Sequence, residues 1–261
     1  MRVWIDGRNG ARDHRIRLRF ATDLAGASTL ADAAFHPVRR ESLAISPDDA
    51  RMEHVVPTAP LHRYVSRYGA GGGATMFSDG LAEYESLDDG AVAVTLVRAV
   101  GALSRRDLPE RPGHAGWPSD TALAQCIGPF SARFAVALHG VDSAAQRDAI
   151  ERMADDVLLP LAGSTLRSNL SAPGVAGGLE LEGDGLAFSA AMPARRAGWI
   201  ALRCVNRREE AVRGIWRLAR DVAEAQLARL DETPLGALEP RGGSISFVAA
   251  PRAIVTVLAR V

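Results

Sequence analysis

The chain has 261 residues, 47% of them hydrophobic and 24% charged, and its formal net charge is zero. This length allows one or two domains with a substantial core. Every basic residue is an arginine, and the arginines are scattered among equally many carboxylates, which argues against a nucleic-acid-binding protein. No apolar run reaches the roughly 18 residues of a membrane span, and the first residues lack the apolar region of a signal peptide, so a cytoplasmic location is expected.

Alternation of apolar and polar residues dominates the first half of the chain and predicts half-buried β-strands. Met1 is followed at once by strand-like residues, which suggests a truncated chain. Residues 16–20 alternate apolar side chains with arginines, and residues 130–138 alternate over a longer stretch. Residues 91–100 are almost continuously apolar, which predicts a strand that is buried on both faces.

The second half contains helix and turn signals as well as strands. Residues 143–158 combine an N-cap serine with apolar residues near helical spacing, which predicts a helix. The Ser-, Gly- and Pro-rich segment 164–178 is expected to separate two β units. Residues 179–188 alternate on both sides of Gly-Asp-Gly, which predicts a β-hairpin. Residues 215–230 are rich in helix formers, whereas residues 245–258 read as two closing strands.

Cysteine, histidine and carboxylate spacing gives no catalytic signature. Cys126 and Cys204 lie in apolar, strand-like surroundings, so both are expected to be reduced and buried rather than joined in a disulfide. The six histidines are dispersed, which predicts no metal site within this chain. No spacing of acidic residues marks the carboxylate pair that a glycosidase needs. No catalytic residue is therefore assigned.

One turn stands out as a candidate binding segment, at residues 78–84. The Asp79-Gly80 step permits a sharp reversal between two strands. Asp79, Glu83 and Tyr84 carry polar groups that a sugar could contact. On these residues alone, a solvated hairpin turn is the simpler interpretation.

The order of motifs over residues 73–138 resembles the C-terminal region of glycoside hydrolase family 38, the α-mannosidases. The family's Asp-Gly-Leu-x-Glu-Tyr/Phe-Glu turn is matched by residues 79–85. Its Ala-x-Thr-Leu-x-Arg-x-Val-Gly-x-Leu-Ser-Arg strand is matched by residues 93–105. Asp-Leu at 107–108 and Arg-Pro-Gly-His-Ala-Gly at 111–116 follow in the family's order.

The resemblance extends to both ends of the chain. A Gln-Cys step at 125–126 precedes the strand that ends in Ala-Leu-His at 137–139. Residues 11–17 and 251–258 are similar to segments of the bacterial members, including mannosylglycerate hydrolases. The resemblance therefore covers essentially the whole sequence and implies a bacterial protein.

The resemblance implies a definite architecture. Family members carry zinc and an aspartate nucleophile in an N-terminal α/β domain, followed by a three-helix bundle and by β domains that include a supersandwich like that of galactose mutarotases. This sequence matches only from the middle of the supersandwich onwards. An all-β fold with one short helix is therefore expected, with residues 1–165 as the second half of the supersandwich and residues 166–261 as a small closing β-sandwich. The resemblance also implies that residues 215–230 are extended, against their helical composition.

The function implied is that of the C-terminal β portion of a retaining α-mannosidase, which hydrolyses α-mannosides and is not catalytic by itself. No cofactor is expected in this chain, because the zinc belongs to the absent catalytic domain. The expected partners are that N-terminal catalytic α/β domain and the α-mannoside, and exposed sheet edges favour a homo-oligomer. The turn residues Asp79, Gly80, Glu83 and Tyr84 are expected to lie near the substrate.

Two other functions remain open on the sequence. One is a free-standing carbohydrate-binding or scaffold module that assembles with a separately encoded catalytic chain. The other is a self-sufficient mutarotase-like enzyme built on half a supersandwich, which would need a histidine and a carboxylate that converge on the concave face.

Overall fold

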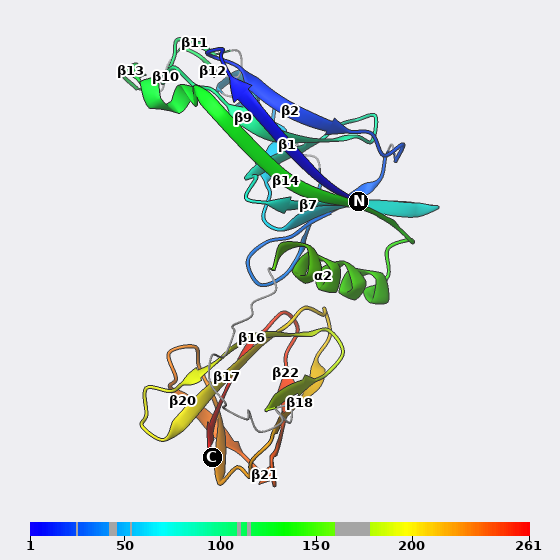
Figure 1. The fold of residues 1–261 in the computed structure, drawn as a ribbon, viewed down its shortest axis with the longest axis vertical. Coiled ribbons are helices and arrows are strands. Elements are labelled where there is room, and N and C mark those ends of the chain that lie inside the picture. Colours follow the sequence, from blue (N-terminus) through cyan, green and yellow to red (C-terminus); the bar gives the residue numbers. More distant parts are fainter. Residues whose placement is uncertain (25, 42–45, 53, 109–110, 114–115, 160–177) are drawn as a thin grey trace, which may run out of the picture. The chain divides into compact units, whose positions relative to one another are not determined.

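The computed structural model describes all residues except 25, 42–45, 53, 109–110, 114–115 and 160–177. The chain divides into two compact units, Met1–Pro160 and Leu161–Val261 (Figure 1). Most of the expected boundary segment, and the expected domain limit at residue 165, lie outside the described residues. Each unit has its own core and is β-rich, as the alternating pattern predicts.

The first unit contains a large antiparallel sheet of order β1-β14-β7-β6-β3-β4. Strand β14 lies between β1 and β7, with Ala135 opposite both Arg2 and Phe77. The long alternating stretch at residues 130–138 therefore forms one long central strand, as predicted. The strands are β1 (Arg2–Asn9), β3 (Ser28–Ala31), β4 (Val38–Arg40), β6 (Tyr64–Gly69), β7 (Gly72–Asp79) and β14 (Gly128–His139).

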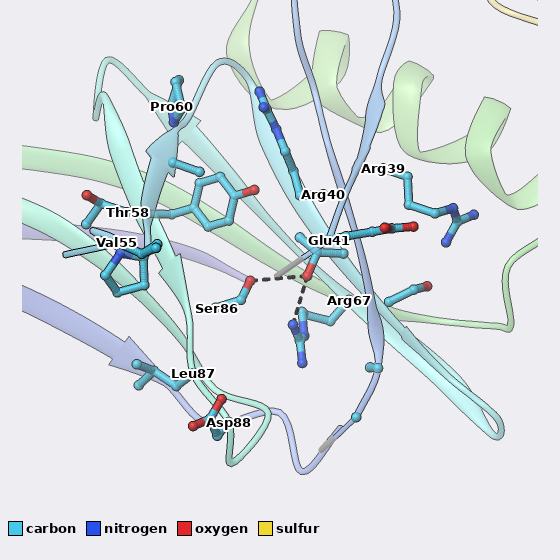
Figure 2. A pocket seen from close by; sticks show the side chains of 17 residues that line it. Arg39, Arg40, Glu41, Val55, Thr58, Pro60, Arg67, Ser86, Leu87 and Asp88 are labelled. Atoms are coloured by element: carbon cyan, nitrogen blue, oxygen red, sulfur yellow. Dashed lines mark hydrogen bonds between the residues drawn. The ribbon is translucent and has the colours of Figure 1, made fainter. Parts of the chain in front are cut away.

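A second antiparallel sheet of order β2-β9-β8-β5 faces the first. It consists of β2 (Arg15–Phe20), β5 (Thr58–Pro60), β8 (Glu83–Ser86) and β9 (Val92–Arg98). Strand β9 is buried along most of its length, which confirms the prediction for residues 91–100. A pocket opens between the two sheets and is lined by residues of both (Figure 2).

Period-two alternation gives the large sheet two apolar faces. Val65 and Met76 are paired across β6 and β7 and belong to the core against the second sheet. Their neighbours Tyr64 and Phe77 point the other way and pack against helix α2 (Ala144–Leu158). The helix begins where it was predicted, with the Ser143 side chain accepting a hydrogen bond from the N–H of Gln146 at 3.1 Å.

Short elements complete the first unit. They are α1 (Asp49–Met52), β10 (Ala102–Leu103), β11 (Asp107–Leu108), β12 (Arg111–Pro112), β13 (Ser119–Asp120) and a 3-10 turn at Ala122–Gln125. Cys126 ends this turn in a left-handed conformation, with φ of 49°, and is exposed. The expectation of a buried Cys126 in a strand was therefore wrong, whereas Cys204 is buried as expected, and both thiols are unpaired.

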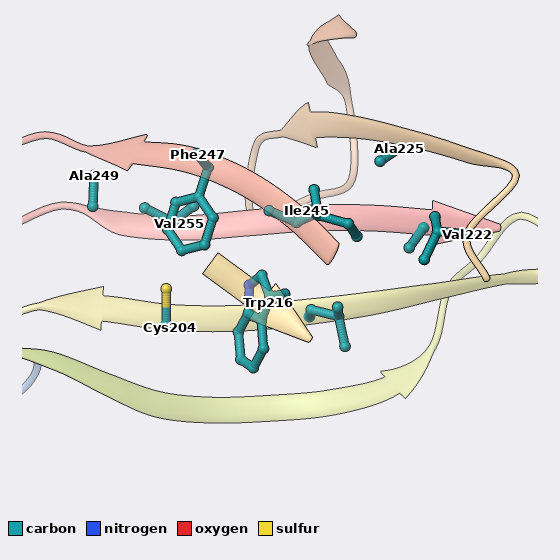
Figure 3. Close-up of a cluster of buried hydrophobic side chains, with 11 residues drawn as sticks. Cys204, Trp216, Val222, Ala225, Ile245, Phe247, Ala249 and Val255 are labelled. Atoms are coloured by element: carbon teal, nitrogen blue, oxygen red, sulfur yellow. The ribbon is translucent and has the colours of Figure 1, made fainter. Parts of the chain in front are cut away.

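The second unit is a sandwich of two antiparallel sheets, of orders β15-β18-β22-β21 and β16-β17-β23-β19-β20. Trp216 and Ile245 from one sheet meet Cys204 and Val255 from the other in the core (Figure 3). The strands are β15 (Leu179–Glu182), β16 (Leu186–Pro193), β17 (Trp199–Asn206), β18 (Val212–Leu218), β19 (Glu224–Ala228), β20 (Pro234–Leu238), β21 (Pro240–Arg241), β22 (Ser244–Ala249) and β23 (Ile254–Arg260).

Residues 215–230 are extended rather than helical. They form the end of β18 and all of β19, with Trp216 fully buried. The family resemblance therefore gave the right structure where helix propensity did not, because burial between two sheets outweighs propensity differences below about 1 kcal/mol per residue.

The predicted hairpin at residues 179–188 was wrong. The turn exists, since the N–H of Leu186 donates to the carbonyl of Gly183 at 3.1 Å. However, β15 pairs with β18 and β16 pairs with β17, so the chain passes from one sheet to the other at this turn. Leu181 and Leu186 both pack against the core between the sheets, so burial of both strands needs no pairing between them.

Candidate functional site

The candidate turn joins β7 of the large sheet to β8 of the second sheet. It is therefore a crossing between two layers and not a hairpin. The Ser78 hydroxyl closes the turn, because it donates to the carbonyl of Leu81 and accepts from the N–H of Leu81, both at 3.0 Å. Gly80 has φ of 87°, a conformation that favours glycine.

The side chains of this turn have three different environments. Asp79 is exposed and, among the described residues, makes no side-chain hydrogen bond or ion pair. Glu83 lies on the outer face of the second sheet and is held there by neighbouring side chains. Tyr84 points to the opposite face, as alternation requires, and is 2% exposed.

Glu83 is held by one hydroxyl and two arginines. Thr95 donates its hydroxyl hydrogen to Oε1 of Glu83 at 2.6 Å. Arg15 approaches the same oxygen at 3.4 Å, and Arg98 approaches Oε2 at 3.3 Å. These partners come from β2 and β9, so the carboxylate links three strands of the sheet and has a fixed orientation.

A cluster of buried charges lies beside the turn. The N–H of Ser78 donates to the carbonyl of Arg63 at 2.8 Å, and the N–H of Leu61 donates to the carbonyl of Ala82 at 2.9 Å. These two bonds attach the turn to residues 61–63.

The cluster contains two buried carboxylates, Asp32 and Glu151, and one guanidinium that joins them. Arg63 donates from Nε to Asp32 at 2.8 Å and from Nη2 to Glu151 at 2.6 Å. The Tyr64 hydroxyl donates to the second oxygen of Glu151 at 2.6 Å. Nδ1 of His62 lies 2.7 Å from Asp32, and this imidazole is exposed.

Electrostatics stabilise the charged guanidinium. Burial lowers the pKa of Arg63, but hydrogen bonds and charge from Asp32 and Glu151 outweigh it and raise this pKa above its ordinary value. Burial, with the charge of Glu151, raises the pKa of the Tyr64 phenol. The cluster therefore ties helix α2, which carries Glu151, to β6 and to the segment before it.

The mutarotase-like alternative needs a histidine and a carboxylate that lie close together, and His62 and Asp32 form such a pair. However, Asp32 is already paired with Arg63. Asp32 is nearly fully buried and accepts from Arg63 as well as contacting His62. It can hold the imidazole in one orientation, as the partner of a general base does. No nucleophile is placed against His62 by any contact of the described residues, so the pair by itself supports no complete reaction.

The cluster was not found from the sequence. Asp32, His62 and Glu151 are separated by long stretches of chain, and none has a motif around it. Only Glu151 lies within a predicted element, the helix at residues 143–158. The sheet topology and the docking of α2 bring the groups together.

The zinc that the sequence resemblance implies has no fitting site among the described residues. Zinc needs three or more converging histidine, cysteine or carboxylate ligands. Within the described part of the chain, no group of three or more such side chains could hold a metal ion. Likewise, none of the described helices combines the length and the apolar character needed to cross a bilayer.

Comparisons with known proteins place this fold. No family model matches the chain. It is 28% identical to a protein of Halalkalibacterium halodurans whose assigned name is mannosylglycerate hydrolase. The matched region of 210 residues covers 80% of this chain and 22% of that protein. An α-mannosidase structure from Enterococcus faecalis V583 superposes on the whole chain with a TM-score of 0.75 and 22% identity.

A second solved structure, of a glycosyl hydrolase family 38 protein from Enterococcus faecalis, gives a TM-score of 0.76 and 23% identity over the whole chain. The chain spans 27% and 28% of these two structures. It thus corresponds to about a quarter of the length of the proteins it matches. The fold is that of one part of these larger proteins.

Proposed function

We propose that this chain, which has the fold and the motif order of the C-terminal β region of glycoside hydrolase family 38, is the β portion of an α-mannosidase and is not catalytic by itself. One observation carries the proposal: the whole chain superposes on only 27% to 28% of two family structures. The catalytic α/β domain, with its zinc, would belong to the part of the enzyme that this chain does not contain.

The turn at residues 78–84 is proposed to face that catalytic domain and its α-mannoside. Asp79 is exposed and unpaired among the described residues, so its carboxylate is free to accept a hydrogen bond. Glu83 is held by Arg15 and Arg98, which supports a role in keeping the turn in place. Gly80 permits the sharp turn that exposes Asp79.

The proposed location is the cytoplasm. Cys126 and Cys204 are both unpaired, as is usual for proteins in a reducing compartment. Self-association is also proposed, because β1 and β4 are the edge strands of the large sheet in the described part of the chain, and an edge strand can pair with a second copy.

The experiment measures hydrolysis of an aryl α-mannoside by the purified chain, with and without added zinc. The same assay is run on the protein encoded by the complete reading frame. We expect no turnover by the chain in either condition and zinc-dependent turnover by the complete protein. Zinc-dependent turnover by the pure chain would refute the proposal, and so would an inactive complete protein that is folded and zinc-loaded.

A further inference from the structure

The pocket between the two sheets of the first unit has a volume of about 700 Å³ and lies away from the candidate turn's exposed residues. Strands β3, β4 and β6 line it from one sheet, and β5 and β8 line it from the other. This volume falls within the range of sites that hold small molecules, roughly 300 to 1,000 Å³.

A buried arginine lines this pocket. Arg67 is 6% exposed and, among the described residues, forms no ion pair. Its Nη1 donates to the Thr29 hydroxyl at 2.8 Å and its Nη2 to the carbonyl of Leu24 at 3.4 Å. Its buried Nε has no hydrogen-bond partner in the described part of the chain. Buried charges are ordinarily paired, because removing a guanidinium from water is costly.

A buried phenol, that of Tyr84, lines the same pocket. The buried hydroxyl of Tyr84 has no hydrogen-bond partner among the described residues, although it lines the same pocket. Burial raises the pKa of Tyr84, and the charges of Arg40 and Arg67 act in the opposite direction to a smaller extent. Arg40 is exposed at the pocket and makes no ion pair among the described residues (Figure 2).

Neutral hydroxyl groups and exposed carboxylates make up much of the remaining polar lining. The hydroxyls of Thr29 and Ser86 lie 3.2 Å apart, and the Thr29 hydroxyl accepts a hydrogen bond from Arg67. Glu41 and Asp88 also line the pocket, but both are exposed, so solvent screens their charge more than that of the buried arginine. The buried part of the pocket therefore presents positive charge and hydrogen-bond donors.

We propose that this inter-sheet pocket binds a small oxyanion, a carboxylate or a phosphate group on a hydroxyl-bearing molecule, with Arg67 as the counter-charge and the Tyr84 hydroxyl as a further donor. The anion would supply acceptors for Nε of Arg67 and the Tyr84 hydroxyl, two buried polar groups that have no partner among the described residues. The nearby hydroxyls of Thr29 and Ser86 suit the hydroxyl groups of the same molecule. This inference does not depend on the mannosidase proposal.

Calorimetric titration of the 261-residue chain with three matched probes tests this site. Glycerate carries the carboxylate, glycerol 3-phosphate carries the phosphate, and glycerol carries neither. We expect saturable binding of at least one anion and none of glycerol, and the tighter anion identifies the charged group. Arg67→Gln is expected to weaken that binding at least about tenfold, the effect of losing a hydrogen bond to a charged group.

Two further variants separate binding from folding and from overall charge. Tyr84→Phe is expected to melt at the wild-type temperature or higher, because it removes only an unpartnered buried hydroxyl, and to bind several-fold more weakly. Arg8→Gln removes an equal charge from β1, at the far edge of the same sheet, and is expected to bind like the wild type.

Three results would overturn the site. One is the absence of saturable binding of either anion by the folded wild-type chain at about 10 mM ligand, a concentration that would reveal even a weak site. Another is an equal loss of affinity in Arg8→Gln and Arg67→Gln. The third is unchanged affinity in Tyr84→Phe, which remains decisive even if Arg67→Gln fails to fold.

Discussion

Raising the pH from about 8 to about 10.5 is expected to weaken the second unit through a single group, the Cys204 thiol. Burial raises the pKa of Cys204 from 9.0 to about 12, and the residue is fully buried in the core (Figure 3). The whole chain contains no lysine, and all its tyrosines and histidines precede residue 140. Across this pH range, Cys204 is therefore the one side chain of residues 161–261 that is expected to titrate.

The sign and size follow from proton linkage. Above the unfolded pKa the unfolded thiol loses its proton while the folded thiol keeps it, so the free energy of unfolding falls as pH rises toward the folded pKa. The slope is about 1.4 kcal/mol per pH unit, which gives a loss of about 2 kcal/mol by about pH 10.5. The stability is fully present below the unfolded pKa of 9.0.

The assay is denaturant unfolding at both pH values, followed by tryptophan fluorescence. Trp199 and Trp216 are buried in the second unit, whereas Trp4 and Trp117 are exposed in the first, so the signal reports mainly on the second unit. Cys204→Ala is the matched control and is expected to lose about 1 kcal/mol at both pH values through the small cavity. Its stability should not change with pH. A wild-type unfolding curve that is as independent of pH as the variant's would refute the reasoning.

Three other predictions follow from the first unit. Arg63→Met is expected to lower the free energy of unfolding by about 3 to 5 kcal/mol, because two buried carboxylates lose their cation. The control Arg217→Met removes a partner of an exposed ion pair and should lower it by less than about 1 kcal/mol. Equal losses in the two variants would contradict the buried network. In the complete enzyme, Asp79→Ala is expected to lower kcat/KM by about one to two decades with stability unchanged, while Glu83→Ala lowers stability as well. Unchanged kinetics in both variants would exclude the turn from the active site, and activity lost only in proportion to stability would indicate a structural role. A thiol reagent should modify only the exposed Cys126 in the native chain, and Cys126→Ser should abolish that reaction. Rapid modification of the Cys126→Ser variant would contradict the burial of the Cys204 thiol.

Local patterns in the sequence predicted several elements of the first unit and indicated the fold. Alternation in residues 130–138 predicted the central strand β14, because a strand with a buried face must repeat every two residues. The N-cap and apolar spacing of residues 143–158 predicted α2 for a similar local reason. The ordered motifs over residues 73–138 indicated the family 38 fold, which the solved structures bear out.

Strand partners were decided only in three dimensions. Residues 179–188 and the turn after β7 each look like a hairpin, yet in both cases the two strands belong to different sheets. Alternation states which face of a strand is buried, but a sandwich buries that face equally well whether the next strand pairs beside it or lies across the core.

The charged clusters depended on the same tertiary arrangement. Asp32, Arg63 and Glu151 meet because α2 packs on the large sheet, and Arg67 is buried because its position on β6 points between the sheets. Neither fact is encoded in a short motif, since each partner lies tens of residues away. Sequence spacing can reveal a site built on one element, whereas a site built from several elements depends on topology, which long-range packing decides.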